Sequence, residues 1–97
     1  MASQDPPRRP RARRDLFYQD VSDGGVLFNP ERDRMIVLNA SAAFVWTCCD
    51  GSRDLEQIAR ELGEALGSAV PAAEDLLRDV RAAVQDFERQ DLLEKDP

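Results

Sequence analysis

The sequence predicts an α+β domain in which a three-stranded antiparallel sheet is followed by three helices, an order typical of winged helix-turn-helix folds. Three short runs of β-forming residues, separated by turn residues, lie between positions 16 and 38. From position 40 onward, apolar residues recur at helical spacing. A chain of 97 residues is long enough for one domain with a single core of modest size.

The strands are predicted from composition and turn chemistry. Leu16-Phe17-Tyr18, Val26-Leu27-Phe28 and Met35-Ile36-Val37-Leu38 are rich in aromatic, β-branched and other apolar residues. Asp23-Gly24-Gly25 and Asn29-Pro30-Glu31-Arg32-Asp33 separate these runs with residues that favour turns. Connections this short favour an antiparallel meander.

The last of these runs, residues 35–38, is apolar on both faces of the strand. A strand with one solvated face would carry a polar residue at every second position. Two interpretations remain open. Either other parts of the chain cover both faces, or this strand is an open edge that accepts a strand from a partner.

A first helix is predicted to follow directly, with Asn39 or Ser41 as its N-cap and Gly51 as the left-handed residue just past its end. Its apolar face comprises Ala42, Val45, Trp46 and Cys49. A second helix begins after Asp54, which has the spacing of a capping box with Gln57. Its apolar face comprises Leu55, Ile58, Ala59 and Leu62.

A third helix is predicted to begin at Pro71, because proline is favoured at the first helical position. Its long apolar stripe comprises Ala73, Leu76, Leu77, Val80, Val84 and Phe87. Leu92-Leu93 then closes the folded part of the chain.

Residues 1–14 are predicted to form a disordered arm, and residues 15–97 the folded domain. The arm carries five arginines (Arg8, Arg9, Arg11, Arg13, Arg14) against Asp5, whereas residues 15–97 have a net charge of −10. The folded part is therefore expected to repel phosphates and to favour basic or apolar partners. The arginines indicate either a solvated tail or a clasp for nucleic acid or an acidic partner.

The residue types that most enzymes use are scarce. The chain has no histidine, which removes the usual general base and the commonest zinc ligand. Cys48 and Cys49 are adjacent, so they match neither a zinc site nor a redox motif, and we interpret them as packing residues. We expect no enzyme activity, no metal and no cofactor. With no signal peptide and no apolar run long enough to span a membrane, we expect a cytoplasmic protein.

Several motifs, in this order and spacing, resemble the PqqD-like family of peptide-recognition domains, known as RiPP recognition elements. The motifs are Val26–Glu31, Leu38-Asn39, Ser41-Ala42-Ala43, Val45-Trp46, Cys49-Asp50-Gly51, the Leu55, Ile58 and Leu62 spacing, Asp79-Val80 and Leu92-Leu93. The resemblance covers residues 16–94 and implies a non-catalytic peptide chaperone of natural product biosynthesis. Asp91 stands where the family usually has glycine, and no tryptophan lies near Leu93. These departures favour a peptide other than the precursor of the quinone cofactor PQQ.

The resemblance also implies a mechanism. The leader segment of a ribosomally made precursor peptide would add as a strand beside Met35, Ile36, Val37 and Leu38, between that strand and the third helix. Ile36, Leu38, Leu77, Val80 and Val84 would line apolar pockets, and Arg78 and Arg81 would pair with acidic leader residues. The periodicity does not decide which flank of the third helix faces the peptide. A separate modifying enzyme, often a radical S-adenosylmethionine enzyme in this family, would then receive the peptide.

A winged-helix nucleic-acid-binding protein is the alternative function, because the element order and the arginine arm are compatible with it. The predicted third helix argues against this alternative, since its charged residues are mostly acidic. No membrane partner is expected.

Overall fold

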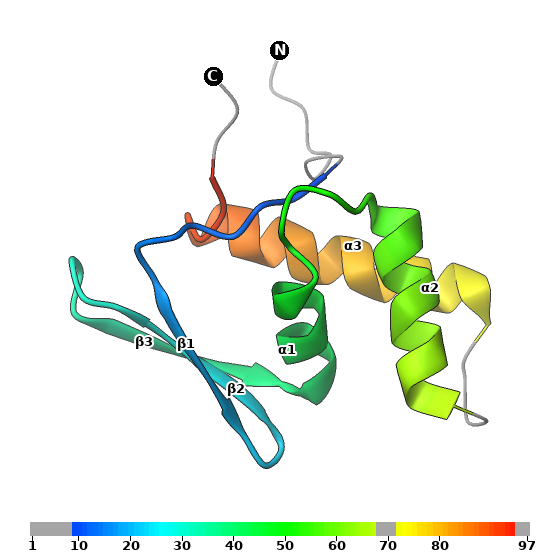
Figure 1. Cartoon of the computed structure of the whole chain (residues 1–97), viewed down its shortest axis with the longest axis horizontal. Helices are drawn as coiled ribbons and strands as arrows, with labels where there is room; N and C mark the ends of the chain where they lie inside the picture. Colours follow the sequence, from blue (N-terminus) through cyan, green and yellow to red (C-terminus); the bar gives the residue numbers. More distant parts are fainter. Residues whose placement is uncertain (1–8, 68–71, 95–97) are drawn as a thin grey trace.

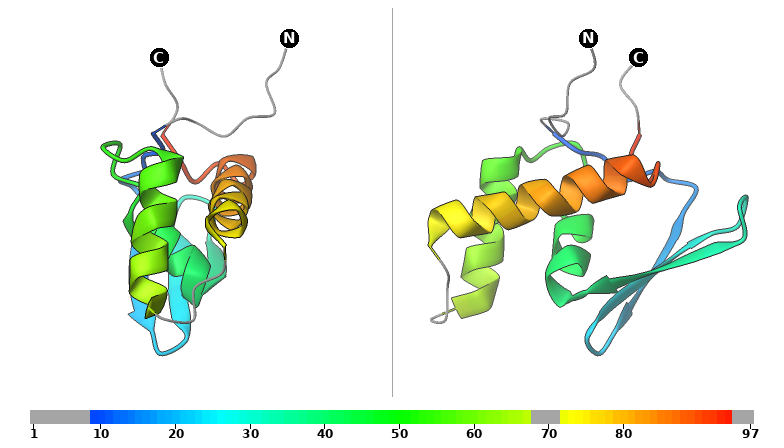
Figure 2. Two further views of the ribbon diagram at one scale, coloured as in Figure 1. Left: turned by 90° about the vertical axis from the view of Figure 1, so that its right-hand side faces the viewer. Right: turned by 180° about the vertical axis from the view of Figure 1, so that it is seen from behind.

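The computed structural model describes residues 9–67 and 72–94 and confirms the predicted α+β architecture (Figure 1). Its sheet has the order β1-β2-β3 and both strand pairs are antiparallel. The strands are β1 (Phe17–Val21), β2 (Gly24–Asn29) and β3 (Arg34–Asn39). The helices are α1 (Ala40–Thr47), α2 (Leu55–Leu66) and α3 (Ala73–Arg89). The helices gather to one side of the sheet, where α1 packs on β2 and β3 (Figures 1 and 2).

A two-residue turn joins β1 to β2 and pairs Val21 with Gly24. Gly24 has a φ of +154°, and a Cβ at this position would collide with the carbonyl oxygen of Leu38 on β3. Glycine is therefore needed here, because β2 and β3 approach closely at the point where β2 begins and β3 ends.

Helix α1 begins at Ala40 and ends at Thr47, two residues before the predicted last apolar position, Cys49. Of the two predicted N-caps the structure uses Asn39, whose side-chain oxygen accepts a hydrogen bond of 2.8 Å from the backbone N–H of Ala42. Gly51 does have a positive φ of 84°, but it lies in the connection to α2 and not at the helix end. Cys49 stays buried because this connection folds back over the core.

The capping box of α2 is present as predicted. The Asp54 carboxylate accepts a 2.8 Å hydrogen bond from the Gln57 backbone N–H, and the Gln57 side chain accepts a 3.0 Å bond from the Asp54 N–H. Helix α3 begins at Ala73. Its predicted start, Pro71, lies outside the described residues.

The end of α3 is closed by a Schellman motif centred on Asp91, which adopts a left-handed φ of 62°. The Leu92 N–H donates to the Phe87 carbonyl at 2.9 Å, and the Asp91 N–H donates to the Glu88 carbonyl at 3.0 Å. Leu92 and Phe87 are both 1% exposed, so the apolar contact that accompanies this motif is made as well. Aspartate thus performs a structural role that more often falls to glycine.

The core lies between the sheet and the three helices. Its buried members on the helices and beyond include Ala43, Val45, Trp46, Ile58, Ala59, Leu62, Leu76, Val80, Val84, Phe87, Leu92 and Leu93. Most of the predicted apolar faces are buried, but Ala73 is exposed. At the centre, the rings of Trp46 and Phe87 meet edge to face with centroids 5.3 Å apart and planes at 88°.

Residues 10–13, which the sequence analysis assigns to the arm, form a strap across the helices in the structure. Residues 1–8 of the predicted arm lie outside the described part of the chain. The strap is held by long-range backbone hydrogen bonds. Ala12 N–H donates to the Cys49 carbonyl at 2.8 Å, and Arg13 N–H donates to the Leu92 carbonyl at 3.0 Å. Pro10 is fully buried, so the strap completes the core.

Within residues 9–67 and 72–94, no helix combines the length and apolarity needed to cross a membrane.

The capping box makes α2 sensitive to one substitution. Asp54→Ala is expected to lower the free energy of unfolding by about 0.5–2 kcal/mol, because the backbone N–H of Gln57 loses its side-chain acceptor. Urea unfolding followed by the fluorescence of Trp46, the single tryptophan, measures the change. Glu56→Ala, in the same first turn but outside the capping box, is the control; equal effects of the two substitutions would contradict the assignment.

Candidate functional site

The unpaired edge of β3 is the candidate site. Because β2 lies in the middle of the sheet, β3 has a partner on one side only among the described strands. The backbone groups at that edge follow from the register. Val21 and Gly24 close a two-residue turn, so their peptide groups bond to each other, and hydrogen bonding then alternates along β2.

This alternation directs Gly25, Leu27 and Asn29 of β2 toward β3, where they pair with Leu38, Ile36 and Arg34. The intervening residues of β3, Met35 and Val37, consequently direct their N–H and C=O groups to the open edge. An added strand would bond to these two residues, whereas the peptide groups of Ile36 and Leu38 already serve the pairing with β2.

The outer face of the sheet, opposite the helices, is uncharged and largely apolar. Every second residue of each strand points to this face, and the side chains that form it are Phe17, Gln19, Val21, Val26, Phe28, Met35 and Val37. Met35 is 66% exposed and Val37 is 76% exposed. Of the two interpretations of the two-faced apolar strand, the structure therefore favours the open edge, because nothing in the described residues covers this face.

The other residues of β3, Ile36 and Leu38, point to the face of the sheet that the helices cover. Leu38 is buried and Ile36 is half-buried. Helix α1 lies between the sheet and α3, since it packs on β2 and β3 as well as on α3 (Figure 2). A strand added beside β3 would therefore lie next to the strand on which α1 packs.

The residues predicted on α3 have different surroundings. Val80 and Val84 are 0% exposed and belong to the core, so they offer a peptide no surface. The predicted role was to line apolar pockets for the peptide. The apolar residues on which that prediction rested are the ones that pack α3 against the core. Leu77 is half-buried and lines a pocket of about 250 Å³ between α2 and α3, together with Glu56, Ala59, Arg60, Ala73 and Leu76.

The two predicted arginines of α3 are exposed. The guanidinium of Arg78 donates to the Asp75 carboxylate at 2.6 Å, one turn earlier on the same helix, so a peptide acid would compete with this pair. The structure thus groups Met35, Ile36, Val37 and Leu38 at one edge, and it does not place Leu77 or Arg78 beside them.

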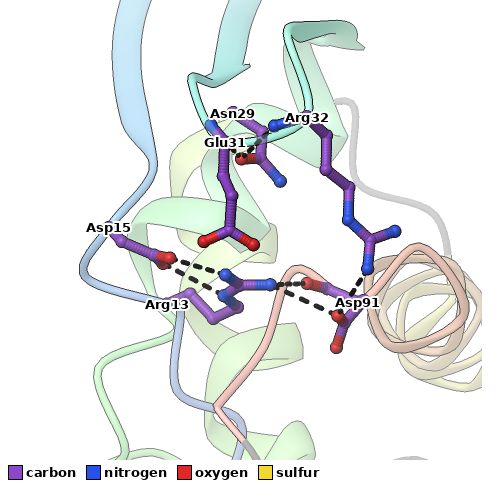
Figure 3. A network of polar contacts seen from close by, with 6 residues as sticks. All are labelled: Arg13, Asp15, Asn29, Glu31, Arg32 and Asp91. Atoms are coloured by element: carbon purple, nitrogen blue, oxygen red, sulfur yellow. Dashed lines mark hydrogen bonds and ion pairs between the residues drawn. The ribbon is translucent and has the colours of Figure 1, made fainter.

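A charged network joins the strap, the β2–β3 turn and the end of α3 (Figure 3). Arg13 donates to Asp15 at 2.5 and 3.0 Å, to the Asp91 carbonyl at 2.9 Å and to the Asp91 carboxylate at 3.3 Å. Arg32, from the turn, lies 3.7 Å from the same carboxylate. The hydrogen bond with Arg13 lowers the pKa of Asp15, and the same bond raises the pKa of Arg13.

Both cysteines are free, buried thiols. Cys49 donates to the Val45 carbonyl at 3.2 Å, and burial raises its pKa to about 12. Burial also raises the pKa of Cys48. In residues 9–67 and 72–94, no group of three or more Cys, Asp or Glu side chains is arranged to hold a metal ion.

Sequence reasoning missed the outer sheet face and the charged network. The parity of Phe17 and Phe28 with Met35 becomes visible only when the strand register is known. The network brings together residues that are 78 positions apart in the case of Arg13 and Asp91. The sequence offered one signal for it, the unusual aspartate at position 91.

Comparison with known proteins now decides the family. The sequence model described as coenzyme PQQ synthesis protein D (PqqD) matches residues 24–93, which run from β2 to the segment after α3. The chain belongs to the PqqD family. This confirms the resemblance inferred from the motifs. No curated protein sequence matches the chain.

Three solved structures share the fold. One is described as lasso peptide synthetase B1 complexed with the leader peptide (18% identity, TM-score 0.73, 90% of this chain and 99% of that chain covered). A second is described as TbiB1 in complex with the TbiA(beta) leader peptide (18% identity, TM-score 0.72, coverage 90% and 98%). The third is the PqqD truncation of Methylobacterium extorquens PqqCD, described as a stand-alone RiPP recognition element (24% identity, TM-score 0.69, coverage 89% and 88%).

The buried thiols generate a pH-dependent prediction. Because the pKa of Cys49 is raised to about 12, its thiolate fraction at pH 8 is very small, and iodoacetamide is expected to leave both cysteines of the folded protein unmodified. Labelling should accelerate as pH rises toward 12, and should be complete at pH 8 in guanidinium chloride. Mass spectrometry counts the adducts. Rapid labelling of folded protein at pH 8 would contradict the packing role.

Proposed function

We propose that this chain is a peptide-binding adaptor. In this proposal it holds the leader segment of a ribosomally made precursor peptide as an added strand on β3 and presents the rest of that peptide to a separate modifying enzyme. The chain itself performs no catalysis and needs no cofactor. Membership of the PqqD family and the fold shared with two leader-peptide complexes support the proposal.

The observation that carries the proposal is the open edge of β3. Met35 and Val37 direct two pairs of backbone donors and acceptors outward, and an extended peptide can satisfy all of them without any particular side-chain sequence. Proteins normally protect such an edge with charges, proline or a covering segment. Here the exposed side chains in the middle of the strand, Met35 and Val37, are apolar, and the exposed polar residues Arg34 and Asn39 lie at its two ends.

Side chains must supply the selectivity. Each backbone hydrogen bond contributes only about 0.5–1.5 kcal/mol net, whereas ordering each peptide residue costs about 1–2 kcal/mol. Apolar leader residues beside Ile36 and Leu38 on the inner face, and beside Met35 and Val37 on the outer face, would offset that cost through burial. Arg81 on the flank of α3 and Arg78, once released from Asp75, are the proposed partners of acidic leader residues.

The modifying enzyme is a separate protein in this proposal. The family resemblance makes a radical S-adenosylmethionine enzyme the proposed partner class, with that enzyme holding the cofactor. The departures at Asp91 and Leu93 make a peptide other than the PQQ precursor the proposed substrate. The nucleic-acid alternative gains no support from α3, where Glu74, Asp75, Asp79, Asp86 and Glu88 outnumber the arginines.

Substitution of Val37 tests the edge directly. Val37→Pro removes an edge N–H and is expected to weaken leader binding about tenfold or more, because the ring also obstructs the added strand. Val37→Thr is the matched control, since threonine has nearly the same shape and keeps the N–H. The wild-type protein, Val37→Pro and Val37→Thr serve as parallel baits in source-cell lysate, and mass spectrometry identifies the captured peptide. Fluorescence anisotropy with the synthetic peptide then gives the three dissociation constants.

Equal affinities of Val37→Pro and Val37→Thr would overturn strand addition at β3. Proline at position 36 is not an equivalent test, because the Ile36 N–H faces β2 and its loss would weaken the sheet itself. Recovery of nucleic acid by all three baits, with no peptide, would instead support the winged-helix alternative.

A further inference from the structure

The strap fixes one side of the Asp91 carboxylate. Arg13 reaches Asp91 from across the chain, and four contacts to Asp15 and Asp91 hold its guanidinium. One of these contacts is to the backbone carbonyl of Asp91, so the position of Arg13 depends only in part on the Asp91 side chain. The left-handed turn at Asp91 directs the carboxylate away from the helix end, toward Arg13 and the β2–β3 turn (Figure 3).

The β2–β3 turn fixes the other side. The buried side chain of Asn29 accepts hydrogen bonds from the backbone N–H groups of Glu31 at 3.1 Å and Arg32 at 3.4 Å. These bonds order the turn from within and so define where the Arg32 side chain starts. Arg32 then reaches out to Asp91 with a single contact of 3.7 Å, and its side chain is 57% exposed.

The hairpin that carries this turn extends to one side of the helices (Figures 1 and 2). One residue of the turn, Asp33 with a left-handed φ of 50°, separates Arg32 from Arg34, the first residue of β3. Any displacement of the turn relative to α3 therefore moves the start of the open edge. The contact between Arg32 and Asp91 bridges the turn to the end of α3 at this point.

We infer that Asp91 is a positioning residue that acts through Arg32: the ion pair holds the β2–β3 turn against the end of α3 and so keeps the open edge of β3 in place for an incoming strand. Preorganisation of this kind strengthens binding by reducing the ordering that the peptide must induce. This purpose rests on the function proposed above. The geometry of the tie can be tested on the peptide-free protein.

Amide hydrogen exchange of the full chain tests whether the ion pair between Arg32 and Asp91 holds the β2–β3 turn in place. Asp91→Asn keeps a residue that tolerates the left-handed conformation but removes the charge, and Arg32→Gln removes the other partner. Each is expected to raise the exchange rates of the Arg34, Ile36 and Leu38 amides about two- to fivefold, the range expected for a partly exposed ion pair. The double variant should show no further increase over Asp91→Asn, because that substitution already breaks the ion pair with Arg32 as well as the one with Arg13.

Two further variants separate positioning from general stability. Arg32→Lys keeps the cation and should hold exchange in β3 near the wild-type rate. Arg89→Gln breaks an exposed ion pair with Asp86 elsewhere on α3 and should leave the exchange rates of the β3 amides unchanged. Unchanged β3 exchange in Arg32→Gln, or an equal increase across β1, β2 and α3, would overturn the inference. Neither result would contradict the proposal that the chain binds a leader peptide. Conversely, a failure to bind a leader peptide would not change what the exchange rates say about the contact between Arg32 and Asp91.

Discussion

The burial of α1 is the constraint on which the rest of the structure depends. This eight-residue helix contains no charged residue, and Ala43, Val45 and Trp46 are all buried. A helix that is apolar on nearly every side must be covered on nearly every side. The sheet covers one side and α2 and α3 cover others, with Trp46 meeting Phe87 of α3 at the centre. Because α2 and α3 are engaged with α1, the described helices lie on one side of the sheet, and no described helix covers its far face.

The arrangement around α1 also explains which parts of the fold the sequence could predict. The helices and strands follow from local signals such as the capping box at Asp54 and the turn residues between strands, and these signals agree with the tertiary packing. The strap could not be predicted in this way. Its order depends on backbone hydrogen bonds between Ala12 and Cys49 and between Arg13 and Leu92, which leave no periodic pattern in residues 10–13.

The candidate site was predictable to a similar, limited extent. The apolar run Met35–Leu38 on a terminal strand of the meander indicated an open edge, and the structure leaves that edge unpaired among the described strands. Periodicity could not separate residues that pack a helix from residues that present a surface, which is why Val80 and Val84 were predicted in the site and lie in the core. The direction of each backbone N–H on β3 required the register, which local sequence does not specify.

The open edge of β3 and the charged network meet at the β2–β3 turn, because β3 begins directly after this turn and Arg32 of the turn belongs to the network. An added peptide antiparallel to β3 would run from the Asn39 end toward the Arg34 end, because β3 runs the opposite way. Its C-terminal continuation, the part to be modified, would leave the domain beside the β2–β3 turn. Arg13, Arg32 and Asp91 lie there as well, so in the proposed complex these residues would border the path of the peptide. Rigidity is useful at that place, since a peptide handed to an enzyme must emerge in a fixed direction.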